Sequence, residues 1–464
     1  MCADLMSINE LTRSIGAYSI SNSSVSGFSS VSINSRNISE GCLFFALEGK
    51  TSDGHKFVSD AFKAGASAAV VESSKLDNFD LLNIAKQNKK DLIVVDNTLK
   101  GLQDSAKVYL EKFPGLLKIG ITGSCGKTTT KEITSAIISN EKNTVMNKGN
   151  LNSETGLPLS VFEVRSCHEV CVFELGMNRR GEISEITEVL KPNVALITNI
   201  GNAHIEFFGT KEEILKEKKC IFNFLTVNDT ALIPGNDEYA SVLAENVNGK
   251  VKFYGEGSFD ELEKTRSLGL DGTEITWAGE KICFSLPGRH SLDDAMAAIA
   301  IAKEARVSNA ALKKGLESVK PLFGRLEILK GRTTVIRDCY NANPESTAKS
   351  IEFCDSLDYS GRKAYVIGDM LELGETSFNA HLRIGEMLFN SKADGIFLFG
   401  SEIKAAASFL ESKCKPFFFT DDINSLSLAL DSYVKTGDLV LLKASRGCAL
   451  ERLTDVLTGE NHVS

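Results

Sequence analysis

The sequence lacks the features that would place the chain in a membrane or in an oxidising compartment. No apolar run approaches the length needed to cross a bilayer. Residues 1–14 lack the basic start and apolar core of a signal peptide. The 11 cysteines include no C-x-x-C pair and have no regular spacing, which argues against a disulfide framework or a zinc site. We therefore expect a cytoplasmic protein with free thiols.

An excess of positive charge is also missing. The net charge of −9 argues against nucleic acid or an anionic membrane as the main partner, although a local basic pocket for phosphates remains compatible with it. Apolar residues at 42% and charged residues at 24% are typical of a soluble globular protein. With 464 residues the chain is too long for one ordinary core, so we expect several domains.

One stretch, LLKIGITGSCGKTTTKE, has the pattern of a phosphate-binding loop. An apolar run over Leu116–Ile121 predicts a buried strand, and a glycine-rich turn follows before a helix opens at Lys127. Such a turn points backbone N–H groups inward, the lysine reaches the outer phosphates and Thr128 can bind Mg²⁺. The longer generic pattern has glycine where this chain has Ile121, so the match is to T-G-S-x-G-K-T. The predicted nucleotide contacts are Gly123, Ser124, Cys125, Gly126, Lys127, Thr128 and Thr129.

Polar residues follow two further strands of the same predicted sheet. Continuous apolar runs at Val170–Leu175 and Val194–Thr198 are typical of parallel strands that are covered on both faces. Glu174 ends the first run, and the loop Asn199–Glu206 follows the second. In doubly wound sheets the carboxyl ends of the strands face the ligand, so both features are expected near the phosphates.

A lysine interrupts the apolar face of the next predicted helix, Lys211–Phe224. Lys218 lies four residues after Ile214 and three before Ile221, in the middle of the expected inward face. The neighbours expected on the outside are Lys216, Glu217 and Lys219. A lone lysine of this kind usually extends its stem to reach water, but a buried one must be paired, neutralised or modified. We favour a functional Lys218.

The remaining sequence predicts two flanking α/β domains. Before the phosphate loop, strands are expected over residues 41–47, 68–71 and 92–95, with a helix over 56–65. After it, strands are expected over residues 333–336, 364–367, 395–399, 417–419 and 439–442. Polar residues again end several of the later strands, at Asp338, Asp369 and Lys443. The predicted fold is therefore α/β with three domains: a small N-terminal domain (1–96), a central P-loop domain with a parallel sheet (97–324) and a Rossmann-like C-terminal domain (325–464).

Ten segments spread over residues 35–452 resemble one family, the Mur ligases of peptidoglycan synthesis. They include SRNISEGCLFFALEG, ITGSCGKTTTKE, GNLNSETGLPLS, ELGMNRRGEI, TNIGNAHIEFFG, FGRLE, DCYNANPES, GDMLELGE and KASRGCALER. The phosphate loop is shared with all Mur ligases and with folylpolyglutamate synthases. DCYNANP and GDMLELGE discriminate better between members of the family. They resemble the corresponding segments of the Mur ligases that add D-alanyl-D-alanine to UDP-N-acetylmuramoyl-tripeptide.

This resemblance implies an ATP-dependent, ADP-forming ligase that works through an acyl phosphate and is usually a monomer. Two alternatives stay open. A ligase for another amino acid or a folate would share the phosphate loop and Lys218 but lack DCYNANP. A catalytically silent member that binds or scaffolds is suggested by Ser291, Asp294 and Cys220, which replace residues usual in the family.

The resemblance also implies roles for individual residues. Thr128 and Glu174 would bind one Mg²⁺, and His204 would bind a second together with a CO₂-derived carbamate on Lys218. Lys127 would hold the outer phosphates of ATP. The further nucleotide contacts would be His290, Asp294, Arg325 and Asp338. The UDP-sugar contacts would be Ser35, Arg36, Asp53 and His55, although these two clusters are equally typical of surface turns. The other substrate contacts would be Asn152, Asn341, Asn343, Lys443, Ser445 and Arg446.

Two departures from the family pattern bear on function. The family usually has asparagine where this chain has Ser291 and Asp294, and an ionised aspartate cannot donate a hydrogen bond to adenine. Arg179 and Arg180 replace a more usual His-Pro, which would affect substrate placement.

Overall fold

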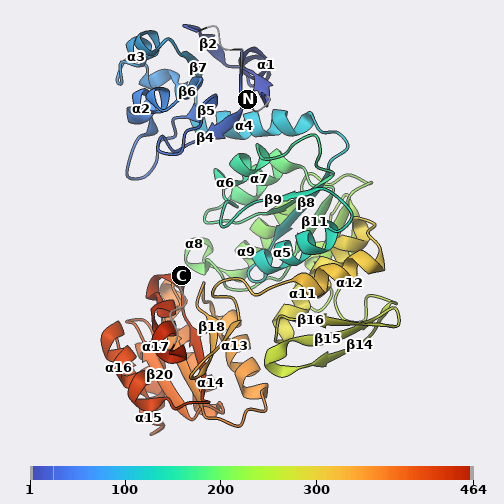
Figure 1. Ribbon diagram of the computed structural model, residues 1–464, viewed down its shortest axis with the longest axis vertical. Helices are drawn as coiled ribbons and strands as arrows, with labels where there is room; N and C mark the ends of the chain where they lie inside the picture. The colour runs from blue at the N-terminus through green and yellow to red at the C-terminus, as the bar shows by residue number, and fades with distance from the viewer. Residues whose placement is uncertain (1–3, 24–25, 460–464) are drawn as a thin grey trace.

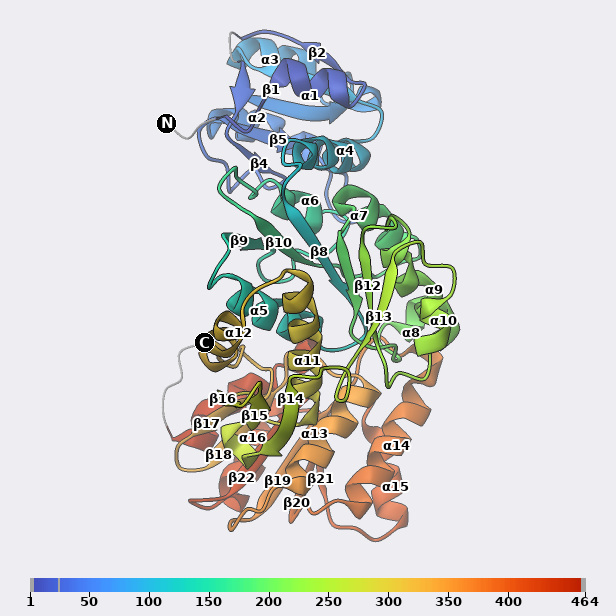
Figure 2. The ribbon, with the colours of Figure 1, turned by 90° about the vertical axis from the view of Figure 1, so that its right-hand side faces the viewer.

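The computed structural model describes residues 4–23 and 26–459. Figures 1 and 2 show three α/β bodies that follow one another along the long axis, with the amino-terminal body at one end and the carboxyl-terminal body at the other. The predicted fold class is confirmed, because each body is built on a sheet that contains parallel strands. The exact boundaries between domains stay a prediction.

The amino-terminal body contains a five-stranded sheet in the order β2-β7-β6-β5-β4. Its strands are β2 (Tyr18–Ile20), β4 (Ser30–Ser32), β5 (Cys42–Phe45), β6 (Ala68–Glu72) and β7 (Asp91–Val95), with β1 (Met6–Ser7) paired to β3 (Gly27–Phe28). Its helices are α1 (Ile8–Ser14), α2 (Val58–Lys63) and α3 (Leu81–Asn88). The three predicted strands are present, and β5, β6 and β7 pair in parallel as buried apolar runs should. Only β2 runs antiparallel to its neighbour in this sheet.

The central body holds a six-stranded parallel sheet in the order β13-β12-β11-β8-β10-β9. Its strands are β8 (Leu117–Thr122), β9 (Thr144–Met146), β10 (Val170–Glu174), β11 (Val194–Ile197), β12 (Thr230–Pro234) and β13 (Lys250–Tyr254). Its helices are α4 (Thr98–Glu111), α5 (Lys127–Ile138), α6 (Gly156–Val161), α7 (Glu182–Leu190), α8 (Ile205–Phe208), α9 (Lys211–Lys219), α10 (Ala240–Ala244), α11 (Arg289–Glu304) and α12 (Asn309–Ser318). The sheet is covered on both faces, because its side chains divide between two separate apolar clusters.

A small antiparallel sheet in the central body was not predicted from the sequence. It consists of β14 (Leu262–Ser267), β15 (Thr273–Trp277) and β16 (Glu280–Phe284), and Figure 1 shows it beside α11. Trp277, Ile275 and Phe284 are buried in the same cluster as α5 and α11. Buried and partly buried residues alternate in TEITW, which is the period of a half-buried strand.

The carboxyl-terminal body has a six-stranded sheet in the order β17-β18-β22-β19-β20-β21. Its strands are β17 (Glu327–Lys330), β18 (Thr334–Asp338), β19 (Lys363–Gly368), β20 (Gly395–Phe399), β21 (Phe418–Thr420) and β22 (Leu439–Lys443). Its helices are α13 (Pro344–Ser356), α14 (Ser377–Asn390), α15 (Lys404–Ser412), α16 (Ile423–Tyr433) and α17 (Thr454–Thr458). All five predicted strands are present and parallel, and β17 adds an antiparallel edge.

Two expectations from composition can be compared with the structure. No helix among residues 4–23 and 26–459 is both long and apolar enough to cross a bilayer. Ten cysteines in the described part of the chain are free thiols, as predicted, and Cys2 lies outside it.

Candidate active site

A cleft of about 910 Å³ lies between the central and carboxyl-terminal bodies, where strands of both sheets end. Most of the predicted site residues line it: Ser124, Cys125, Gly126, Lys127, Thr128, Thr129, Asn152, Glu174, His204, Lys218, His290, Asp294, Arg325, Asp338, Asn341, Asn343, Lys443 and Arg446. Gly123 and Ser445 adjoin these residues in the chain without lining the cleft, and the four predicted UDP-sugar residues lie in the amino-terminal body.

The phosphate loop is held rigidly by the strand next to it. Gly126 has φ +82° and begins α5, a left-handed conformation that favours glycine. Asn199, directly beyond β11, accepts a hydrogen bond from the Cys125 N–H (3.0 Å) and donates one to the Cys125 carbonyl (3.1 Å). Asn199 therefore lies beside the phosphate loop, and its proximity to bound phosphates stays a prediction. The loop needs little reorganisation to receive a phosphate at the helix N-terminus.

Two lysines converge on one carbonyl oxygen of this loop. The Lys127 ammonium donates to the Gly123 carbonyl at 2.8 Å, and Lys218 donates to the same oxygen at 2.9 Å. Lys218 is only 1% exposed and shares its inward face with Ile214 and Ile221, as the helical spacing predicted. Burial lowers the pKa of Lys218 well below its ordinary value, and the charge of Lys127 lowers it further. Both effects favour the neutral amine of Lys218 over the ammonium.

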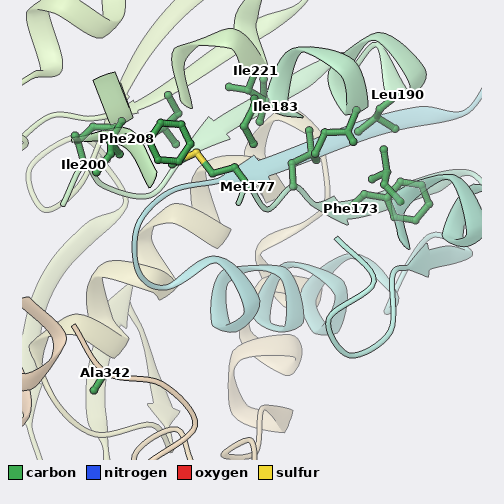
Figure 3. Close-up of a cluster of buried hydrophobic side chains, with 14 of the residues drawn as sticks. Phe173, Met177, Ile183, Leu190, Ile200, Phe208, Ile221 and Ala342 are labelled. Carbon is green, nitrogen blue, oxygen red and sulfur yellow. The ribbon is translucent and has the colours of Figure 1, made fainter. Parts of the chain in front are cut away.

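The surroundings of Lys218 explain why its pKa is lowered. The Met177 sulfur lies 3.7 Å from its side-chain nitrogen, and Figure 3 shows Met177 among the apolar side chains of Ile183, Phe208 and Ile221. These groups offer little solvation to a cation.

The position predicted for Glu217 was wrong. Glu217 was expected on the outside of α9, but it is only 8% exposed. Its carboxylate accepts hydrogen bonds from the N–H groups of Gly181 (2.8 Å) and Ile183 (2.9 Å), at the beginning of α7. A carboxylate is favourable there because it satisfies free N–H groups and the helix dipole.

An oxygen-rich cluster faces the phosphate loop from the end of β10. Thr128 donates to Glu174 Oε2 at 2.8 Å, and Asn152 donates to Glu174 Oε1 at 2.7 Å. Arg325 donates to the Thr128 hydroxyl at 3.1 Å, which brings the start of the carboxyl-terminal body to this cluster. Hydroxyl and carboxylate oxygens are ligands that Mg²⁺ prefers, so Thr128 and Glu174 fit the metal that was predicted for them.

Asn147 is a site residue that the sequence analysis missed. Its amide accepts from the Glu174 N–H (3.0 Å) and donates to the Glu174 carbonyl (2.9 Å), so it fixes the backbone that carries the carboxylate. Asn147 directly follows β9, a strand that was not predicted. The rule that polar residues at strand ends face the ligand would have identified it.

His204 faces the cleft from the loop after β11 and meets the carboxyl-terminal body. Its Nδ1 lies 2.7 Å from Glu372 Oε2, an ion pair when the imidazole is protonated. Both residues have a left-handed backbone, with φ +66° for His204 and φ +62° for Glu372. No group of three or more His, Cys, Asp or Glu side chains in the described residues could hold a metal by itself.

The predicted nucleotide pocket contains a buried aspartate, Asp294. Burial, the largest effect, raises the pKa of Asp294 well above its ordinary value, and Asp293 raises it further. This direction favours the protonated acid, which can donate a hydrogen bond as an asparagine amide would. The effect of Asp294 on adenine binding stays a prediction. Burial also lowers the pKa of His290 to about 4, so this imidazole is neutral.

Some of the predicted carboxyl-terminal residues are held by contacts within the protein, and others are exposed in the cleft. Lys443 is buried, pairs with Asp338 at 2.9 Å and donates to the Asn341 carbonyl at 2.9 Å. Asn343 accepts from the Ser346 N–H at the start of α13 (2.8 Å) and donates to the Cys125 sulfur (3.0 Å), so it links α13 to the phosphate loop.

Ser445 supports the loop that carries Glu372. The buried Ser445 hydroxyl accepts from the Leu371 N–H at 2.9 Å. Arg446 is 56% exposed, pairs with Glu451 at 3.0 Å and lines the cleft together with the exposed Asn341. Arg446 and Asn341 are therefore the accessible members of the predicted set.

The predicted UDP-sugar residues stay a prediction. His55 is 1% exposed, with Nδ1 2.6 Å from Asp53, and its Nε2 accepts from the Glu72 N–H at 3.0 Å. Although burial raises the pKa of Asp53, its hydrogen bonds with His55 and Lys75 lower it to about 2. Ser35 and Arg36 form a turn in which Arg36 is exposed.

The two arginines that replace His-Pro are engaged with carboxylates. Arg179 donates from Nε to Glu154 at 2.8 Å and from Nη1 to Glu185 at 2.9 Å. Arg180 pairs with Glu213 at 3.1 Å. Their effect on substrate placement stays a prediction.

Comparison with protein families gives three matches along the chain. Residues 27–109 match the model described as "Mur ligase family, catalytic domain". Residues 121–302 match "Mur ligase middle domain", and residues 324–446 match "Mur ligase, glutamate ligase domain".

Individual proteins agree with these matches. UDP-N-acetylmuramoyl-tripeptide–D-alanyl-D-alanine ligase of Treponema pallidum is 38% identical over 98% of this chain and 100% of its own. The protein of that name from Bacillus subtilis is 35% identical over 91% of this chain and 92% of its own. MurF from Acinetobacter baumannii superposes with a TM-score of 0.87 at 28% identity, over 98% and 99% of the two chains. MurF ligase from Thermotoga maritima, solved with ADP, has a TM-score of 0.78 at 30% identity, over 93% and 97%.

Proposed function

This chain belongs to the Mur ligase family, and we propose that it joins D-alanyl-D-alanine to UDP-N-acetylmuramoyl-tripeptide with release of ADP and phosphate. One observation carries the proposal most directly. Lys127, Lys218 and the Thr128–Glu174 cluster meet around the phosphate loop in a single cleft between two domains. The relatives cited above are named for this reaction.

The chemistry of the reaction explains why such a site is needed. A carboxylate is a poor electrophile, so the terminal phosphoryl group of ATP is transferred to the carboxylate of the tripeptide, which gives an acyl phosphate and ADP. The amine of the dipeptide then attacks the carbonyl carbon, and phosphate leaves as the amide forms. Both steps gather negative charge on phosphate oxygens, so the protein must mainly position the reactants and neutralise that charge.

The described residues supply these functions. The phosphate loop presents N–H groups and the N-terminus of α5, and Lys127 can move from the Gly123 carbonyl to a phosphate oxygen. Asn147 and Asn152 orient Glu174 toward Thr128. Mg²⁺ bound at Thr128 and Glu174, and a second ion at His204, would neutralise phosphate charge.

Lys218 is proposed to carry a carbamate formed with CO₂. Only a neutral amine attacks CO₂, and burial and the charge of Lys127 both lower the pKa of Lys218, which favours that form. The modification would replace a poorly solvated amine with a carboxylate, which adds an acidic oxygen ligand beside the phosphate loop.

Contacts across the cleft support closure of the domains during the reaction. Arg325 reaches Thr128, Asn343 reaches Cys125, and Glu372 reaches His204. Each contact meets an element that would hold phosphate or metal. Closure of this kind would exclude water from the acyl phosphate.

Release of ADP tests the proposal. ATP, UDP-N-acetylmuramoyl-tripeptide and D-alanyl-D-alanine are supplied together and then omitted one at a time. ADP release is expected only with all three, and Lys127→Ala should lower the rate by at least about a hundredfold.

Other outcomes identify the alternatives. Release with a folate or a single amino acid in place of the dipeptide would indicate a related ligase. Tight binding of ATP without any release would indicate a silent member.

A further inference from the structure

We propose that Glu372 binds the ammonium group of the incoming amine substrate. This inference rests on the proposed function, because it concerns how the amine partner of that ligation enters the cleft. It assigns a charged contact to a residue that the sequence analysis did not identify.

The position of Glu372 is unusual and well supported. It lies in the loop after β19, in the GDMLELGE segment, and its φ of +62° is a conformation that a non-glycine residue rarely adopts. Such strain persists only where surrounding contacts hold it, and it is often found at binding sites. Here the Ser445 hydroxyl accepts from the preceding N–H of Leu371 (2.9 Å), and the following Gly374 packs against Glu206.

The partners of Glu372 leave it open to a ligand. Its side chain is 49% exposed, and it forms an ion pair with His204, whose charge depends on protonation. The pair contains no lysine or arginine, and the Glu372 carboxylate lines the cleft. A cationic ligand can therefore replace His204 at this carboxylate.

The six other carboxylates that line the cleft are already committed. Glu174 accepts from Thr128 and Asn152, whereas Asp338 holds Lys443. Asp294 is buried, and burial raises its pKa well above the ordinary value, which disfavours its ionised form. Of the remaining three, Glu132 pairs with Lys131 and Asp293 accepts a hydrogen bond from Arg289. Asp237 accepts from the N–H groups of Ile200 and Tyr239. Within the described lining, Glu372 is the carboxylate whose only charged partner is an imidazole.

Charge complementarity favours a zwitterionic ligand on this wall. D-alanyl-D-alanine enters with an ammonium at one end and a carboxylate at the other. The ammonium would be repelled by Lys127, Arg325 and Arg446, which also line the cleft. Arg446 lies beside the loop that carries Glu372. A Cβ atom built on the next residue, Gly447, would lie 3.0 Å from Cδ1 of Leu371, the residue before Glu372. An accessible anion and an accessible cation therefore lie on neighbouring loops of the same wall.

The test compares the dipeptide with an analogue in which a hydroxyl replaces the ammonium, D-lactyl-D-alanine. Steady-state kinetics on the full-length protein would measure KM for each substrate and inhibition by the analogue. For Glu372→Gln we expect KM for D-alanyl-D-alanine to rise at least about tenfold, as the loss of a charged hydrogen bond predicts, while KM for ATP stays within about twofold. The preference for the dipeptide over the analogue should shrink by a similar factor.

Two further variants make the result specific. Glu372→Asp keeps the charge and should recover much of the preference for the ammonium. Glu375→Gln changes an exposed carboxylate in the same segment and should behave as the wild type.

The possible failures can be distinguished. If the wild type ligates D-alanyl-D-alanine but Glu372→Gln keeps both KM and preference, the ammonium contact alone is overturned. A rise in KM for ATP without a change in preference would also overturn it and would assign Glu372 to His204 instead. If the wild type does not ligate the dipeptide, both the proposed function and this inference fail.

Discussion

The two walls of the cleft are built in different ways. The central wall is fixed by its own domain, because Asn199 holds the phosphate loop and Asn147 holds Glu174. The carboxyl-terminal wall reaches the site through contacts that cross between domains, from Arg325, Asn343 and Glu372. Rigid placement suits the transfer of a phosphoryl group, whereas separable contacts suit the entry and exit of substrates. The predictions below test this difference, beginning with the largest expected effect.

Lys218→Ala should break the central wall and abolish measurable ligation. The variant loses the nitrogen that would carry the carbamate, and a short added carboxylic acid should partly restore activity by occupying the space. ADP release measures both effects. Lys216→Ala is a matched control on the same helix, because its side chain is 72% exposed. Activity that survives Lys218→Ala would contradict the role of this residue.

Variants of Asn343 should separate the two contacts that it makes. Asn343→Ala removes both the cap of α13 and the donor to Cys125, and it should cost about 1 kcal/mol of stability and about tenfold in kcat/KM. Asn343→Asp keeps an acceptor for the Ser346 N–H, so it should retain stability and lose activity. Thermal unfolding and ADP release provide the two measurements. Equal activity in Asn343→Asp and the wild type would exclude a role for the contact between domains.

Glu217→Ala should weaken the central wall through stability alone. Loss of the carboxylate leaves the N–H groups of Gly181 and Ile183 without their acceptor and should cost about 1 kcal/mol. Denaturant unfolding measures this loss. Glu213→Ala, which removes a carboxylate from the outer side of the same helix, should change stability by less than about 0.5 kcal/mol. Similar losses in both variants would contradict the proposed cap.

Asp294→Asn should have the smallest effect, and the effect should depend on pH. The native state holds a proton on Asp294 that the unfolded state releases near the ordinary aspartate pKa of 3.8, so native stability falls as pH rises from 3.8 to the raised native pKa. Asparagine removes this dependence. The variant should match the wild type near pH 4 and be more stable at pH 7, as thermal unfolding at several pH values would measure. A constant difference across this range would contradict a protonated Asp294.

The sequence predicted the central wall better than the opposite wall for a physical reason. Local spacing encodes a phosphate loop, a strand that ends in Glu174 and an inward helical position at Lys218, so all three follow from the order of residues alone. Glu372 and Glu345 act across a domain boundary, and no periodicity in the chain indicates such a partner. Glu345, for example, accepts from the Asn202 amide at 2.6 Å although 143 residues separate them.

Burial also changed chemistry that residue type alone suggests. An aspartate in a sequence suggests an anion, yet burial in the folded chain raises the pKa of Asp294 well above its ordinary value, which favours the protonated acid. Glu217 was placed outside because helical spacing gives the side of a helix but not what covers that side. The acceptor role of Glu217 toward α7 depends on tertiary packing.

Gly126 packs so closely against Asp294 that the aspartate side chain fills the space where a side chain at position 126 would begin. An ideal Cβ on residue 126 would fall 2.0 Å from Asp294 Oδ1, so even alanine at the loop would displace the acid. Any substitution at position 294 therefore meets a steric limit set by the phosphate loop. A residue larger than aspartate at position 294 would press on the phosphate loop, whereas a smaller or equal-sized residue would not.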